Sequence, residues 1–158
     1  MSRLAACLLL AATPAAADVV VTFDEGAPKD RFTIALEGDC ALQSETVVID
    51  LAPAPAGLIF DVTGSGAGIE VFQPFELATG QLARMPEVRD GDRAVSLEVT
   101  LAPSEAVAFT IDVDDTVSAR GITVSGAEIA GAVVRVGAAE GRFGEDAVAR
   151  VEMAACLS

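Results

Sequence analysis

The amino-acid sequence predicts an all-β domain, folded as a two-sheet antiparallel β-sandwich, with an open β-barrel as the alternative. Three observations lead to this fold class. Apolar and polar side chains alternate along several short segments, Gly and Pro turn signals separate these segments, and no segment combines a helical period with caps at both ends. The length of 158 residues is sufficient for one domain with its own hydrophobic core.

The expected strands can be followed along the chain. Alternation is clearest over residues 31–37, 95–101 and 107–114, where one set of side chains would face a core and the other set water. Further strands are expected at 19–24, 45–51, 57–62, 68–77, 122–125, 132–136 and 147–153. Turn signals separate them at 26–28, 53–57, 64–68, 91–92 and 137–144. Residues 76–90 are the best candidate for a short helix or a long loop.

The first residues have the pattern of a secretory signal peptide. Arg3 gives a positive start, an apolar run covers residues 4–12, and three alanines at 15–17 form a small-residue cleavage site. The apolar run is far shorter than the about 20 residues that a membrane helix needs. We therefore expect residues 1–17 to be a signal peptide and residues 18–158 to be a single periplasmic or secreted β-sandwich domain with no integral membrane segment.

Cleavage would remove Cys7 and leave two cysteines, Cys40 and Cys156. An even pair of cysteines in an oxidising compartment predicts a disulfide, with two free thiols as the alternative. A bond between Cys40 and Cys156 would tie the C-terminal strand to the N-terminal half of the domain. Without such a bond a terminal edge strand tends to fray.

The residue types that are missing exclude several functions. The sequence contains no His, Trp or Tyr, and no Asn. Without His there can be no Ser-His-Asp triad, no Cys-His dyad and no imidazole metal site. Without Trp or Tyr the usual aromatic platforms for nucleotide bases and sugars are absent. The sequence therefore favours a protein that is not an enzyme.

The charge is strongly acidic. Ten basic residues face 24 acidic residues, and loss of Arg3 with the signal peptide would take the net charge from −14 to −15. Such a charge repels nucleic acid and anionic membrane surfaces, so we expect no nucleic-acid partner. It serves general solubility and also attracts cations, and the sequence leaves both interpretations open.

An acidic run at 112–115 is the best candidate for a cation site. Asp112 and Asp114 should leave the same face of a strand, with Asp115 turning into the following loop. Closely spaced carboxylates repel one another unless a cation lies among them, and hard oxygen ligands suit Ca²⁺. The alternative is a solvated strand end. Three other acids are expected to face outward and could complete the site: Asp50, Asp61 and Glu128.

Four strings make the sequence similar to a known family: VTF at 21–23, EGAPKDRF at 25–32, GLIFDVTG at 57–64 and FTIDVDDT at 109–116. They resemble small exported proteins of marine alphaproteobacteria that are called "aggregation factor core" proteins, after a sponge adhesion proteoglycan. The resemblance covers most of the chain after the signal peptide. It implies an adhesion function that depends on calcium and on carbohydrate contacts, and it brings no catalytic residue with it.

Two functions are therefore expected. The first is an exported, non-enzymatic binding or adhesion module, assisted by Ca²⁺ and acting on a protein or cell-surface partner. The second is a periplasmic enzyme, or an enzyme accessory domain, that works through carboxylates.

Overall fold

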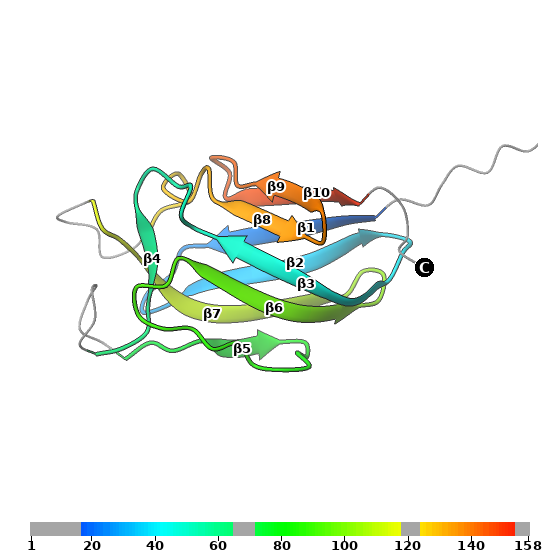
Figure 1. Cartoon of the computed structure of the whole chain (residues 1–158), viewed down its shortest axis with the longest axis horizontal. Helices are drawn as coiled ribbons and strands as arrows, with labels where there is room; N and C mark the ends of the chain where they lie inside the picture. The colour runs from blue at the N-terminus through cyan, green and yellow to red at the C-terminus, as the bar shows by residue number, and fades with distance from the viewer. Residues whose placement is uncertain (1–16, 65–71, 118–123, 154–158) are drawn as a thin grey trace, which may run out of the picture.

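The computed structural model describes residues 17–64, 72–117 and 124–153, and in these residues the chain forms ten β-strands in two antiparallel sheets (Figure 1). The fold is sandwich-like, with one sheet curled into a half-barrel. This confirms the expected all-β class. None of the described segments forms a helix long and apolar enough to cross a membrane.

The larger sheet has six strands. Its order is β10-β1-β2-β7-β4, and β5 also pairs with β7. The strands are β1 (Ala17–Asp24), β2 (Asp30–Gly38), β4 (Leu58–Asp61), β5 (Glu76–Thr79), β7 (Ala106–Asp115) and β10 (Val148–Met153). The ten-residue strand β7 is long enough to pair with β2 through its first part and with β4 through its last four residues.

The smaller sheet has four strands in the order β6-β3-β8-β9. They are β3 (Leu42–Asp50), β6 (Ala94–Leu101), β8 (Val133–Val136) and β9 (Ala139–Arg142). Strand β6 alternates strictly between exposed and buried residues, as a strand with one face on a core should.

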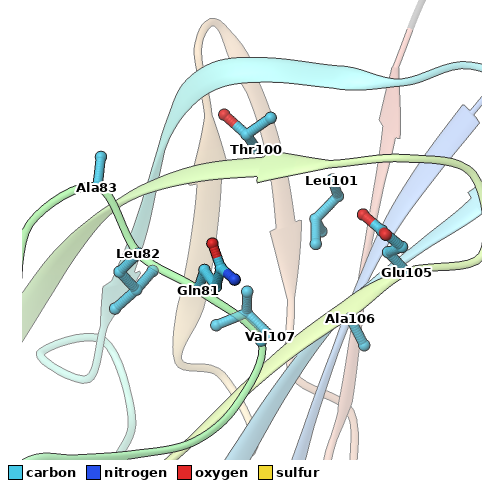
Figure 2. A pocket seen from close by; sticks show the side chains of 9 residues that line it. Gln81, Leu82, Ala83, Thr100, Leu101, Glu105, Ala106 and Val107 are labelled. Atoms are coloured by element: carbon cyan, nitrogen blue, oxygen red, sulfur yellow. The ribbon is translucent and has the colours of Figure 1, made fainter.

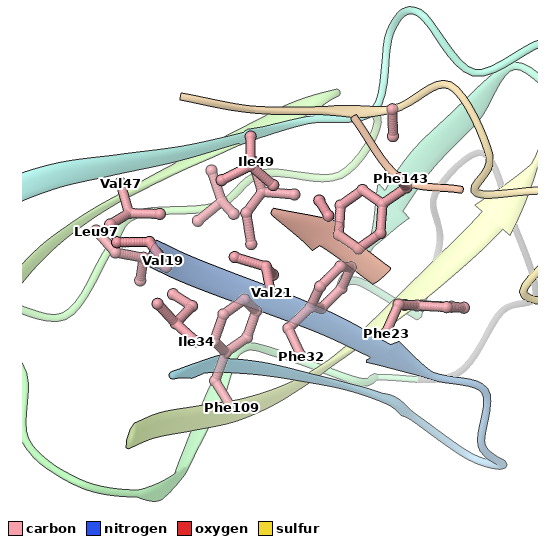
Figure 3. Packing of buried hydrophobic residues seen from close by; sticks show 14 of the residues in the cluster. Val19, Val21, Phe23, Phe32, Ile34, Val47, Ile49, Leu97, Phe109 and Phe143 are labelled. Carbon is pink, nitrogen blue, oxygen red and sulfur yellow. The ribbon is translucent and has the colours of Figure 1, made fainter. Parts of the chain in front are cut away.

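The core fills the space between the two sheets (Figure 3). Its centre is Phe32, which has no exposed surface. The Phe32 ring lies 5.2 Å from the ring of Phe109, which it stacks against, and 5.1 Å from the ring of Phe23. Full burial of one such side chain contributes about 1.5–3 kcal/mol to stability, so this phenylalanine cluster is a major part of what holds the sheets together.

The two long sides of the sandwich differ. On one side β9 packs closely against β10, since a Cβ at Gly141 would collide with the carbonyl oxygen of Arg150. On the other side, β6 and β7 are separated by a cavity of about 560 Å³ (Figure 2). Leu82, from the segment between β5 and β6, lines this cavity together with Leu101 and Val107. The sandwich is thus closed along β9 and β10 and open along β6.

Strand β9 was not expected from the sequence, and two other segments were expected wrongly to be strands over part of their length. Residues 137–144 were expected to be a turn, but the turn is confined to the region of Gly137, and Ala139–Arg142 forms a strand. In the segment expected at 68–77, residues 72–75 are not a strand, and β5 covers 76–79. Residues 124 and 125 are also not in a strand. For the segment 76–90, expected to be a short helix or a long loop, residues 76–79 form β5 and residues 80–90 are a loop. The remainder of the segments 68–77 and 122–125 lies outside the described residues.

The expected signal peptide and disulfide involve residues that the structure does not describe. Residues 1–16 lie outside the described ranges, and β1 begins at Ala17, after which cleavage is expected. Cys40 is buried just after β2, whereas Cys156 lies outside the described residues. The cleavage and the pairing of the two cysteines both stay predictions.

Candidate metal site

Three aspartates meet on one face of the β4–β7 ladder. Asp61 is the last residue of β4 and lies directly opposite Asp112 in the antiparallel register. Asp114 lies opposite Ile59, two residues further along each strand. Since side chains two residues apart share a face of a strand, the three carboxylates point to the same side of the sheet. One oxygen from each lies within 4.8 Å of the other two.

These carboxylates are buried. Asp61 has no exposed surface, and Asp112 and Asp114 are 9% and 7% exposed. No donor within the described part of the chain makes a hydrogen bond to either side-chain oxygen of Asp61. An ionised carboxylate in this condition loses its hydration without replacement, which is expensive. A proton or a cation at Asp61 would remove this cost.

The pKa values of Asp61 and Asp112 are raised because these carboxyl groups are buried close to other carboxylates. Burial is the largest cause that raises the pKa of Asp61 to about 7, and the nearby carboxylate of Asp90 adds to it. Burial likewise raises the pKa of Asp112 to about 7, with further contributions from Asp114 and Asp30. Lys29 acts in the opposite direction on Asp112, but it does not offset the burial. Near neutral pH the group is poised between holding protons and holding a cation.

A fourth aspartate supports the backbone of the site. Asp30 is 1% exposed and accepts hydrogen bonds from the backbone N–H of Gly26 and of Val113, both at 3.0 Å. Val113 lies between Asp112 and Asp114, at a point where β7 continues beyond the beginning of β2. The Asp30 carboxylate thus takes the place of the missing strand neighbour. Burial nevertheless raises the pKa of Asp30 to about 6.

The geometry of the three oxygens fits Ca²⁺. Calcium takes six to eight oxygen ligands at 2.3–2.6 Å, so oxygens on opposite sides of the ion are about 4.6–5.2 Å apart. Mg²⁺ binds at about 2.0–2.1 Å, which brings opposite oxygens to about 4.0–4.2 Å. The oxygens of Asp61, Asp112 and Asp114 lie within 4.8 Å of one another, so one ion can contact all three, and the preference for Ca²⁺ follows from the all-carboxylate ligand set.

The acids that were expected to form one cation site lie in different parts of the structure. Asp112 and Asp114 share a face as expected, and Asp61 joins them. Asp115 is outside this group of described acids, and its carboxylate accepts the backbone N–H of Val117 at 3.2 Å. Asp50 forms an ion pair with Arg135 at 3.0 Å. Glu128 accepts hydrogen bonds from the backbone N–H and the hydroxyl of Ser125, both at 2.7 Å.

The expectation that Asp61, Asp112 and Asp114 face solvent was wrong. Alternation predicts which residues share a face, but it does not reveal that both faces of β7 are covered near its end, as they are from Ile111 to Asp114. Neither Asp30 nor Asp90 was among the acids expected at a cation site. Of these two residues, only Asp30 has a sequence feature that could have drawn attention to it, since it directly precedes a clearly alternating strand.

Comparisons of the chain with family models, with curated proteins and with solved structures yield no match. The assignment of a function therefore depends on the site itself.

Proposed function

We propose that the protein is an exported, non-enzymatic binding module of the adhesion type, whose Asp61, Asp112 and Asp114 hold a Ca²⁺ ion. The observation that carries the proposal is the complete burial of Asp61, whose two oxygens receive no hydrogen bond within the described residues and face two further carboxylates. A divalent cation would compensate these charges directly, and the strongly acidic chain attracts such cations.

Burial of the three carboxylates supports a binding role over a catalytic one. General acid–base catalysis needs a carboxyl group within reach of the substrate. Two cavities, of about 560 Å³ and 370 Å³, are lined by other residues: the first lies between β6, β7 and residues 80–83, and the second lies on the outer face of β3 and β6. A buried ion in such a position stabilises the fold and the loops around it, which is the usual contribution of Ca²⁺ to extracellular modules.

The adhesion part of the proposal draws on the resemblance described above. Two of the four strings of that resemblance, at 57–64 and 109–116, contain all three proposed ligands. The partner that we propose is a protein or another component of a cell surface, and the location is periplasmic or secreted.

The proposal is tested by titrating the purified mature chain with Ca²⁺ in a calorimeter, after treatment with a chelator and dialysis. We expect one ion per chain and a higher melting temperature with Ca²⁺, because a ligand at 100 times its Kd adds about 2.7 kcal/mol to the stability. Mg²⁺ should act more weakly, and NaCl at matched ionic strength should not reproduce the shift. The proposal fails if Ca²⁺ does no more than matched NaCl, or if Asp114→Ala retains the full calcium shift.

A further inference from the structure

A turn from a distant part of the chain closes the free edge of β4. The backbone N–H of Phe60 donates to the carbonyl oxygen of Asp92 at 2.8 Å, and the N–H of Gly91 donates to the carbonyl oxygen of Phe60 at 2.9 Å. These two bonds form a short ladder on the side of β4 opposite to β7. The turn around residues 89–92 therefore lies beside the strand that carries Asp61.

This turn brings another carboxylate to the site. One side-chain oxygen of Asp90 accepts the backbone N–H of Val62 at 3.3 Å, which fixes Asp90 next to the end of β4. The Asp90 carboxyl group acts on that of Asp61 and raises its pKa, although Asp90 lies outside the group of three whose oxygens are within 4.8 Å of one another. Two carboxylates close to each other repel, and a proton or a cation between them removes that repulsion.

We propose that Asp90 is a fourth carboxylate ligand of the cation site, and that binding of Ca²⁺ there locks the turn at residues 89–92 onto β4. This inference rests on the proposed function, because it needs the ion to bind at Asp61, Asp112 and Asp114. The ligands then come from three segments that are far apart in the sequence: β4, β7 and the turn. An ion held in this way joins the segments as a cross-link.

The additional ligand determines which cation the site takes. Four carboxylates around one ion give a hard, highly anionic set of oxygens, which suits Ca²⁺ or its trivalent lanthanide substitutes. Mg²⁺ gives up its water reluctantly and usually keeps only one or two carboxylates, so four of them in a buried site fit it poorly. Asp90 thus acts as a specificity-determining ligand.

Locking of the turn has an effect beyond the site. The segment that leads into the turn lines two cavities, through residues 80–83 in the one beside β6 and β7 and through residues 84–87 in the one on the outer face of β3 and β6. Since this segment is a loop, its position depends on where its two ends are held. An ion on Asp90 would hold the end nearer to β6.

The test compares two variants of the mature chain that change the same turn by the same chemistry. Asp90→Asn removes the proposed ligand, while its amide oxygen can still accept the Val62 N–H. Asp92→Asn is the control, because the Asp92 carboxylate accepts the backbone N–H of Arg89 at 2.8 Å and supports the turn itself. Calcium affinity is measured by calorimetry, and hydrogen exchange of residues 81–92 is followed with and without Ca²⁺.

We expect Asp90→Asn to weaken Ca²⁺ binding by about tenfold or more, with little change for Mg²⁺. Calcium should slow amide exchange over residues 81–92 in the wild type and in Asp92→Asn, but not in Asp90→Asn. If the wild type binds Ca²⁺ and Asp90→Asn binds it equally well, the fourth ligand does not exist and the proposed function stands. Equal weakening by both variants overturns the ligand role, because support of the turn then explains the loss. A wild type that binds no Ca²⁺ overturns both proposals.

Discussion

Asp61 lies directly opposite Asp112 in the β4–β7 ladder, and both carboxylates are buried. Like charges that face each other across two strands destabilise a sheet. The arrangement costs stability unless something neutral or positive compensates it.

Replacement of Asp61 by Asn should stabilise the metal-free protein. The amide has the same shape as the carboxylate but no charge, and the charge that it removes is buried and accepts no hydrogen bond from the residues that the structure describes. We therefore expect the free energy of unfolding to rise by roughly 1–3 kcal/mol at pH 7.5. The same variant should lose the calcium-dependent rise in melting temperature. Glu98→Gln, which removes a charge from an exposed position on β6, should change neither quantity. Denaturant unfolding with chelator and with Ca²⁺ measures both effects.

The stability of the metal-free protein should increase as the pH falls. The pKa values of Asp61 and Asp112 are both about 7 in the folded state, above the ordinary value of 3.8. Between these values the folded state binds more protons than the unfolded state, so stability is lost as the pH rises from about 4 through 7. Saturating Ca²⁺ should remove this loss, because the ion replaces the protons. Urea unfolding at pH 5, 6, 7 and 8 tests the trend, which would be refuted by a chelated protein that is most stable at pH 8.

Asp30→Ala should have the opposite effect on stability to Asp61→Asn. It leaves two backbone N–H groups, those of Gly26 and Val113, without their acceptor. One buried unsatisfied donor costs about 1–3 kcal/mol, so the loss should reach roughly 2–4 kcal/mol. Asp146→Ala, which removes an exposed acceptor for the N–H of Val148, should cost less than about 1 kcal/mol. Equal losses for the two variants would contradict the role given to Asp30.

Lys29 should oppose cation binding while it stabilises the fold. Its side chain is only 14% exposed, and its ammonium group lies 3.0 Å from Glu76 and 2.7 Å from the carbonyl oxygen of Pro74, so it anchors the beginning of β5. Its charge also acts on Asp112. Lys29→Met should therefore lower stability but tighten Ca²⁺ binding a few-fold at low ionic strength and pH 8. Weaker binding in this variant would contradict the electrostatic argument.

The expected processing can be checked by mass spectrometry of exported protein. The mature chain should begin at Asp18, and its mass should rise by about 2 Da on reduction if Cys40 and Cys156 form a disulfide. A mature, soluble protein that begins with Met1 would refute the export. An unchanged mass on reduction would refute the disulfide.

Alternation was enough to predict most of the strands, since β2, β6 and β7 each place apolar residues at every second position. It could not predict β9, because Ala139–Arg142 contains no apolar alternation and pairs only as the return of a hairpin from β8. The hairpin needs a residue with a positive φ at its turn, and Gly137, whose φ is 56°, adopts this conformation without strain.

The candidate site was predictable only in part. The spacing of Asp112 and Asp114 was sufficient to place them on one face. The contribution of Asp61 depends on the pairing of β4 with β7, and that of Asp90 on a turn that binds the other edge of β4. Both are long-range contacts, which no local pattern in the sequence encodes.

Pairing of the first strand with the last has a consequence for how the chain folds. β1 lies between β2, which follows it directly, and β10, the last strand that the structure describes. During synthesis β1 and β2 can meet early, but the other edge of β1 must wait until residues 148–153 have been made. Until then the nascent chain presents an unpaired edge beside an apolar face, which is a template for aggregation. We expect folding to be slow and largely post-translational, with a need for protection by a chaperone in the interval.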